Sequence, residues 1–70
     1  MASRDEIDRY ERSLNYIGMI ISQAPADILD GWDDAAGMTR RQKLTQDLQL
    51  IAACDDPRIR ARARDYLARL

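Results

Sequence analysis

Apolar residues recur at intervals of three and four over the first third of the chain. They form one stripe along a helix: Ile7, Tyr10, Leu14, Ile17 and Ile21. Ser3 stands before this stripe with Glu6 three residues later, which is the spacing of a capping box at a helix start. Pro25 disfavours helical geometry at Ala24, so the pattern predicts a helix over residues 4–23.

Two further helices are predicted in the second half of the chain. Thr39 and Gln42 have capping-box spacing, and Asp56 followed by Pro57 is typical of a helix start. These signals predict helices over residues 40–54 and 57–69. Their inward faces are expected to consist of Leu44, Leu48, Ile51 and Ala52 in the first, and of Ile59, Ala63, Tyr66, Leu67 and Leu70 in the second.

The segment between these helices lacks a long periodic pattern. Pro25 suits the first position of a short helix and Gly31 suits its end, so we expect a helical turn near residues 25–30 and then a loop. The chain is rich in Ala, Leu and Arg and has neither Val nor Phe, a balance that favours helices over strands. The predicted fold is therefore all-α, a small helical bundle in a single domain over residues 1–70.

The core of so short a chain is marginal unless something else stabilises it. Cys54 is the only cysteine and histidine is absent, so an intrachain disulfide and the usual zinc ligands are excluded. Oligomerisation or binding of a partner is then the remaining way to stabilise the fold.

The end of the first predicted helix is apolar on nearly every side, which is typical of a helix that is covered on every side. Gly18 would allow the backbone of a second chain to approach closely. We therefore expect a homodimer with this interface: Tyr10, Leu14, Tyr16, Ile17, Met19, Ile20 and Ile21. In the alternative, the remaining segments wrap this helix within one monomer.

An acidic segment surrounds the only tryptophan. Trp32 would supply a large interface anchor, and the neighbouring carboxylates would favour a basic partner, such as the DNA-binding domain of a bacterial regulator. In the alternative, Trp32 fills the core and the aspartates stay solvated. Leu50 lies off the inward face of its helix and is a further candidate contact. The predicted partner-binding residues are Asp27, Ile28, Asp30, Trp32, Asp33, Asp34 and Leu50.

The charge is divided unevenly along the chain. Residues 1–38 carry eight acidic and three basic side chains, whereas residues 39–70 carry eight basic and four acidic ones. The basic half permits an alternative function as a small dimeric DNA-binding repressor. Against it, Asp55 and Asp56 stand where the recognition helix would begin and would repel phosphate. On a helical wheel the arginines of residues 58–69 form two rims beside an apolar stripe, where they can pair with the acidic first helix of the same or another subunit.

Catalysis has little support in the sequence. Without histidine the usual general base near neutral pH is missing, and Cys54 has no partner that would activate it. We expect no enzymatic activity, no cofactor and no metal site. A charged N-terminal region and the lack of an apolar run of membrane-spanning length predict a cytoplasmic protein. Ten arginines against one lysine indicate a GC-rich bacterial or phage source. The expected function is that of a small regulator, inhibitor or adaptor that binds a partner protein.

Overall fold

The computed structural model describes residues 3–70, and helices dominate this part of the chain. Helix α1 spans Arg4–Gln23, α2 spans Ala26–Leu29, α3 spans Arg40–Ala52 and α4 spans Pro57–Arg69. The three long helices and the short helical turn are thus confirmed, except that α3 ends at Ala52 rather than at residue 54, because Ala53 and Cys54 already belong to the turn before α4. Between α2 and α3 lie two short strands that were not predicted, β1 at Trp32–Asp33 and β2 at Met38–Thr39. No helix within residues 3–70 is both long and apolar enough to cross a membrane.

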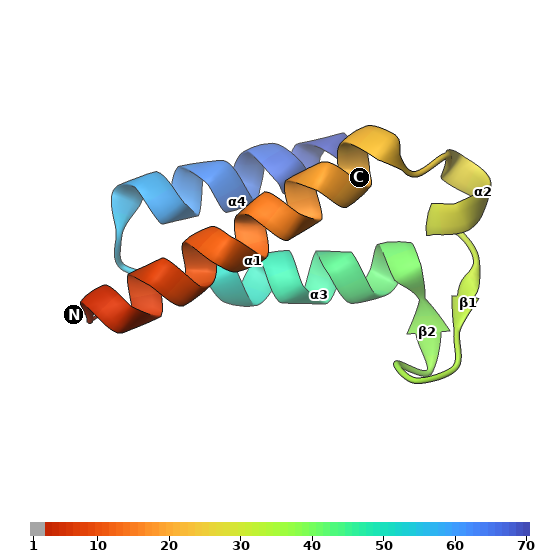
Figure 1. Cartoon of the computed structure of the whole chain (residues 1–70), viewed down its shortest axis with the longest axis horizontal. Coiled ribbons are helices and arrows are strands. Elements are labelled where there is room, and N and C mark those ends of the chain that lie inside the picture. The colour runs from red at the N-terminus through yellow and green to blue at the C-terminus, as the bar shows by residue number, and fades with distance from the viewer. Residues whose placement is uncertain (1–2) are drawn as a thin grey trace.

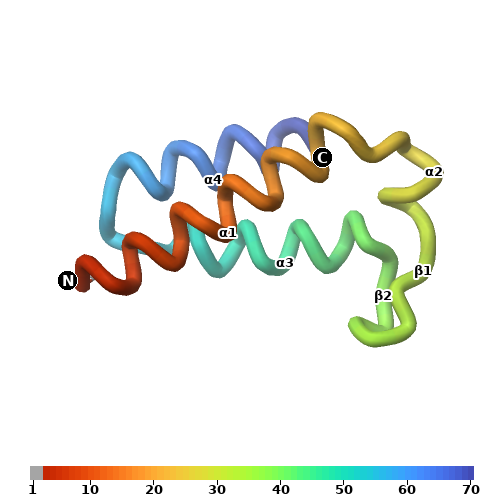
Figure 2. Tube along the Cα trace, viewed as in Figure 1, coloured from red at the N-terminus to blue at the C-terminus, as the bar shows by residue number. Residues whose placement is uncertain are grey.

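The three long helices form a bundle with α2 and the hairpin at one end (Figure 1). Helices α1 and α4 run in the same direction, and α3 runs opposite to both, as the trace in Figure 2 shows. Helix α4 packs along α3 and also against α1, whereas α1 and α3 approach each other over a shorter stretch. One side of the α1–α3 pair is therefore less completely covered than the side that faces α4.

Local capping explains where the long helices begin. The Thr39 hydroxyl accepts a hydrogen bond from the Gln42 amide (3.2 Å), and the Gln42 side chain accepts one from the Thr39 amide (3.0 Å). At α4, one carboxylate oxygen of Asp56 accepts from two successive backbone amides, those of Arg58 (3.0 Å) and Ile59 (3.1 Å). The predicted N-terminal caps of α3 and α4 are both confirmed. At α1 the Ser3 hydroxyl accepts a hydrogen bond from the Glu6 amide (3.2 Å). This bond is one of the two that make up the predicted capping box.

The hairpin holds the segment before α3 in a defined path. Trp32 pairs with Thr39 and Asp33 with Met38 in an antiparallel register. The Asp33 carboxylate accepts hydrogen bonds from two amides of the turn (3.1 and 3.4 Å). Gly37 then adopts φ +69°, a conformation that glycine reaches without strain. The conformation of the turn is therefore fixed by its own backbone and by the Asp33 side chain. Trp32 thus lies in an ordered hairpin.

The core lies where the three long helices meet and is closed at one end by α2. Its buried side chains are Leu14, Ile17, Leu29, Leu44, Leu48, Ile51, Cys54, Ile59 and Ala63. Cys54 takes the place of a small apolar residue at the end of α3, as its surroundings in the sequence suggest.

Gly18 serves a contact within the chain rather than one with a second chain. A Cβ atom at this position would lie 2.5 Å from the Tyr66 hydroxyl oxygen and 2.8 Å from Cζ of the same ring. Glycine therefore leaves room on α1 for the end of the Tyr66 side chain of α4.

Candidate functional site

Five large apolar side chains of the described residues are exposed in this small fold. Their exposed fractions are 62% for Tyr16, 49% for Met19, 43% for Ile28, 63% for Trp32 and 72% for Leu50. All except Trp32 line hollows on the α1–α3 side of the molecule. Exposed apolar residues scattered singly need no explanation, but a group on one face indicates an interaction surface.

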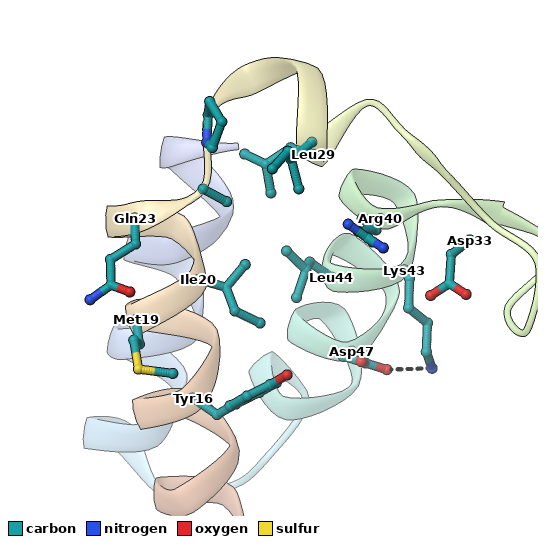
Figure 3. Close-up of a pocket in the computed structure, with 13 residues that line it drawn as sticks. Tyr16, Met19, Ile20, Gln23, Leu29, Asp33, Arg40, Lys43, Leu44 and Asp47 are labelled. Atoms are coloured by element: carbon teal, nitrogen blue, oxygen red, sulfur yellow. Dashed lines mark hydrogen bonds and ion pairs between the residues drawn. The ribbon is translucent and has the colours of Figure 1, made fainter.

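The larger hollow is a groove of about 650 Å³ between α1, α2 and α3. Figure 3 shows Ile20 of α1 and Leu44 of α3 directed toward each other across it, with Leu29 of α2 at one end. Tyr16 extends from α1 toward α3 (Figure 3). The floor and walls are thus apolar, and three different elements supply them.

A second hollow of about 370 Å³ continues the groove toward the start of α1. Tyr16, Leu44 and Asp47 line both hollows, and Leu50 and Tyr10 lie along the second. The apolar surface therefore follows the α1–α3 boundary from α2 to Leu50. We call this surface, formed by the two hollows together, the α1–α3 groove.

Charged side chains lie along the edge of the groove. Lys43 and Asp47, one helical turn apart on α3, form an ion pair with 3.0 Å between nitrogen and oxygen (Figure 3). Arg40 lies at the α2 end of the groove, where the nearby Asp33 carboxylate already accepts two hydrogen bonds from the hairpin. The sequence pattern does not mark Lys43 or Asp47 as functional residues, although their spacing of four residues is that of a helical ion pair.

The structure decides between the two interpretations of Trp32. Its side chain is exposed, so the alternative that it fills the core is wrong, and Leu29 of α2 is buried there instead. The aspartates around Trp32 have different surroundings. Asp30 pairs with Arg41 at 2.8 Å and Asp33 caps the hairpin turn, whereas Asp27 and Asp34 are solvent-exposed.

The residues predicted for a dimer interface divide into three groups. Leu14 and Ile17 are 0% and 4% exposed, because the core of the same chain covers them. Neither therefore offers surface to a second chain. Tyr16 and Met19 are exposed, and the half-buried remainder consists of Tyr10, Ile20 and Ile21.

The structure brings two predicted sites together. Tyr16, Met19 and Ile20, expected at a dimer interface, line the same groove as Ile28 and Leu50, expected to contact a partner. Sequence spacing did not indicate this, because it depends on how α2 folds back beside α3. Trp32 and Asp34 line neither hollow and form a separate surface on the hairpin.

Among residues 3–70 the structure shows no ion pair between the arginines of α4 and the acidic start of α1 in the same chain. Arg62 donates to the amide oxygen of Asn15 at 2.9 Å. Arg69 pairs with Asp65 of its own helix at 3.1 Å, and its guanidinium lies 5.6 Å from the centre of the Tyr66 ring. Of these contacts only the hydrogen bond between Arg62 and Asn15 joins α4 to α1, and none of these residues lines the groove.

No protein-family model matches the chain, and no curated protein or solved structure shows significant similarity to it.

Proposed function

We propose that this chain is a non-enzymatic regulator or adaptor that binds a partner protein through the α1–α3 groove. The observation that carries the proposal is that four of the five large exposed apolar side chains line this one groove. Covering a large apolar side chain contributes about 1.5–3 kcal/mol in area terms, and part of this is lost to the cost of association. Four such side chains on one face are enough to support specific binding of moderate affinity.

The test compares two neighbouring substitutions on α3. Leu50→Glu places a carboxylate in the groove, whereas Gln49→Glu adds the same charge at an exposed position outside both hollows. Each variant and the wild type are used to capture proteins from cells that express the chain. A partner retained by wild type and Gln49→Glu but lost by Leu50→Glu is expected. If all three forms retain the same proteins equally, the groove is not the binding surface.

The hairpin supports a second contact surface of the same adaptor. Trp32 is exposed on a fixed turn, and the exposed carboxylates of Asp27 and Asp34 belong to the same segment. A tryptophan among carboxylates suits a basic partner, and a DNA-binding domain is one such partner. Binding through this surface should weaken as salt is raised from 50 to about 500 mM, and Trp32→Ala should abolish it. If binding does not depend on salt, or if Trp32→Ala leaves it unchanged, the hairpin is not a second binding surface.

The groove could instead be the interface of a homodimer formed through α1, because Tyr16, Met19 and Ile20 lie on the wall of the groove. A second copy placed there would exclude a partner protein. Sedimentation of the pure chain at micromolar concentration tests this candidate: a monomer at all concentrations rules it out.

The alternative of a DNA-binding repressor receives less support from the fold. The N-terminus of α4, which would enter the DNA groove, is occupied by the Asp56 carboxylate bound to two backbone amides. A carboxylate at that position opposes phosphate approach. We therefore place the function in protein binding, and a mobility-shift titration with duplex DNA at low salt is expected to show no complex.

A further inference from the structure

We propose that residues 24–39, which comprise α2 and the hairpin, form a strap that opens as one unit while the three long helices stay packed. We call this segment the strap. In the closed form that the structure shows, the strap supplies the α2 end of the α1–α3 groove. Opening of the strap would therefore change the shape of the groove, whether or not the groove binds a partner.

The packing of the strap on the rest of the fold is limited. Helix α2 packs against α3, and β2 leads directly into α3, whereas the long helices pack mainly on one another. Within residues 3–70 the buried core includes only one side chain of the strap, Leu29, which is 7% exposed. Ala24 adds a half-buried contact at the junction with α1. The strap is thus held on the core chiefly by one leucine of α2 (Figure 3).

The polar contacts between the strap and α3 are also few. Apart from the cap at Thr39, the structure shows two of them within the described residues. The Arg40 amide donates a hydrogen bond to the carbonyl oxygen of Gly31 at 3.0 Å. The Asp30 carboxylate pairs with Arg41 at 2.8 Å, but the Asp30 side chain is 63% exposed, so solvent screens this pair. Release of the strap would therefore break few interactions that stabilise the bundle.

Both ends of the strap are extended residues at which its path can change. These are Ala24 (φ −78°, ψ 128°) and Thr39 (φ −69°, ψ 157°). The Ala24 amide donates to the carbonyl oxygen of Ile20 in α1 (2.8 Å), and Thr39 exchanges two hydrogen bonds with Gln42 of α3. The caps of both long helices are therefore local, and the helices would keep them when the residues between are released.

Opening of the strap would alter the groove at its α2 end. Pro25, Ile28 and Leu29 of the strap line the groove, and so does Leu44 of α3, which is 8% exposed. Without Leu29 this end of the groove would be continuous with the core around Leu44. The groove would then have two forms, a closed one of about 650 Å³ and a longer open one. Segments with few buried apolar contacts open most easily, and ligand-binding loops are drawn from such segments.

Native-state hydrogen exchange of the full chain at low concentrations of urea tests the proposal. Backbone hydrogen bonds of the closed strap protect three amides: Leu29, Asp30 and Arg40. The bundle is monitored at Leu48 of α3 and Ala63 of α4, both of which are fully buried. We expect the three strap amides to share one opening equilibrium and to be at least about tenfold less protected than Leu48 and Ala63. Their exchange should also depend less on urea, because opening of the strap exposes little surface.

Two core substitutions distinguish opening of the strap from unfolding of the whole chain. Ile59→Val removes one buried methyl group at the start of α4, at the end of the bundle away from the strap (Figure 1). It weakens the bundle in the closed and the open form alike, so exchange of Leu48 should rise by about threefold to tenfold and exchange of the strap amides should not change. Leu29→Ala weakens the closed form, so all three strap amides should exchange faster by the same factor, at least about tenfold.

Strap amides that match Leu48 in protection and in urea dependence would overturn the proposal, because the strap and the bundle would then unfold together. So would strap amides that Ile59→Val accelerates as much as Leu48. Different responses of the three strap amides to Leu29→Ala would mean separate local fluctuations and would also reject a single strap. If Leu29→Ala does not fold, the wild type and Ile59→Val still decide. The capture experiment with Leu50→Glu tests the proposed function separately.

Discussion

The side chain of Trp32 is 63% exposed, although it is the only indole of a chain that buries few large side chains. The neighbouring Leu29 is only 7% exposed and closes the core from α2. Two apolar residues three positions apart therefore have different roles, one in stability and one at the surface.

Stability measurements on these two residues should show the difference. Leu29→Ala is expected to lower the free energy of unfolding by about 2–3 kcal/mol, because it leaves a cavity in the core. Trp32→Ala is expected to change it by less than about 0.5 kcal/mol. Urea denaturation followed by circular dichroism gives both values, and acrylamide should quench the fluorescence of Trp32 efficiently in the native chain. A loss above about 2 kcal/mol for Trp32→Ala would show that the indole is packed in the core.

The contact between Gly18 and Tyr66 allows a second measurement at single residues. Gly18→Ala improves helix propensity by up to about 1 kcal/mol, but its methyl group overlaps the phenol ring. Because the overlap is with the far end of the half-buried Tyr66 side chain, which has to shift, we expect it to offset most of the propensity gain and to leave a net change of less than about 0.5 kcal/mol.

The control for this substitution is the same change with the ring removed. In a Tyr66→Leu background, Gly18→Ala is expected to stabilise the chain by about 1 kcal/mol, since only the propensity term remains. If Gly18→Ala changes the stability equally in both backgrounds, the Tyr66 ring does not oppose the added methyl group.

At the scale of the elements, the sequence predicts the helices well because their signals are local. Thr39 with Gln42, and Asp56 with Pro57, mark helix starts by side chains that bind amides three residues away or less. Such signals need no knowledge of the rest of the fold.

The hairpin and the groove could not be predicted from the same kind of signal. Strands of two residues show no alternation, and Asp33, which fixes the turn, resembles any solvated acidic residue in the sequence. The groove exists because α2 lies beside the start of α3 and α1 meets α3 over a short stretch only. Periodicity identifies the apolar side of a helix, but the angle between two helices is set by packing.

The start of α3 provides a test at this scale. Thr39→Ala removes the acceptor for the Gln42 amide and should lower the free energy of unfolding by about 1 kcal/mol, whereas Thr39→Ser keeps the hydroxyl and should have little effect. Urea denaturation of the two variants measures the difference. Equal stability of the alanine and serine variants would mean that the hairpin alone determines where α3 begins.

At the scale of the whole molecule, Arg41 connects three distant segments. Its guanidinium pairs with Asp30 after α2 and donates to the carbonyl oxygen of Leu70 after α4. It therefore joins the hairpin end of the bundle to the end of α4.

Removal of this connection should affect the whole fold. Arg41→Ala is expected to cost about 1–1.5 kcal/mol, mostly through the hydrogen bond to Leu70. Asp30→Asn is expected to cost less than about 0.5 kcal/mol, since the Asp30 side chain is 63% exposed and solvent screens the pair. Thermal unfolding of both variants gives the comparison, and an equal loss for the two would assign the effect to the ion pair instead.

Leu44 is a core residue that also lines the groove, so ligand occupancy and folding are linked through it. A domain of this size has a stability of about 4–10 kcal/mol, and a ligand present at a hundred times its dissociation constant adds about 2.7 kcal/mol. Filling the groove thus lowers the unfolded fraction by about two orders of magnitude. Because proteases act on the unfolded fraction, copies without a partner would be degraded first. If a partner protein fills the groove as proposed, the cellular amount of this chain would follow the amount of that partner without any separate control of its synthesis.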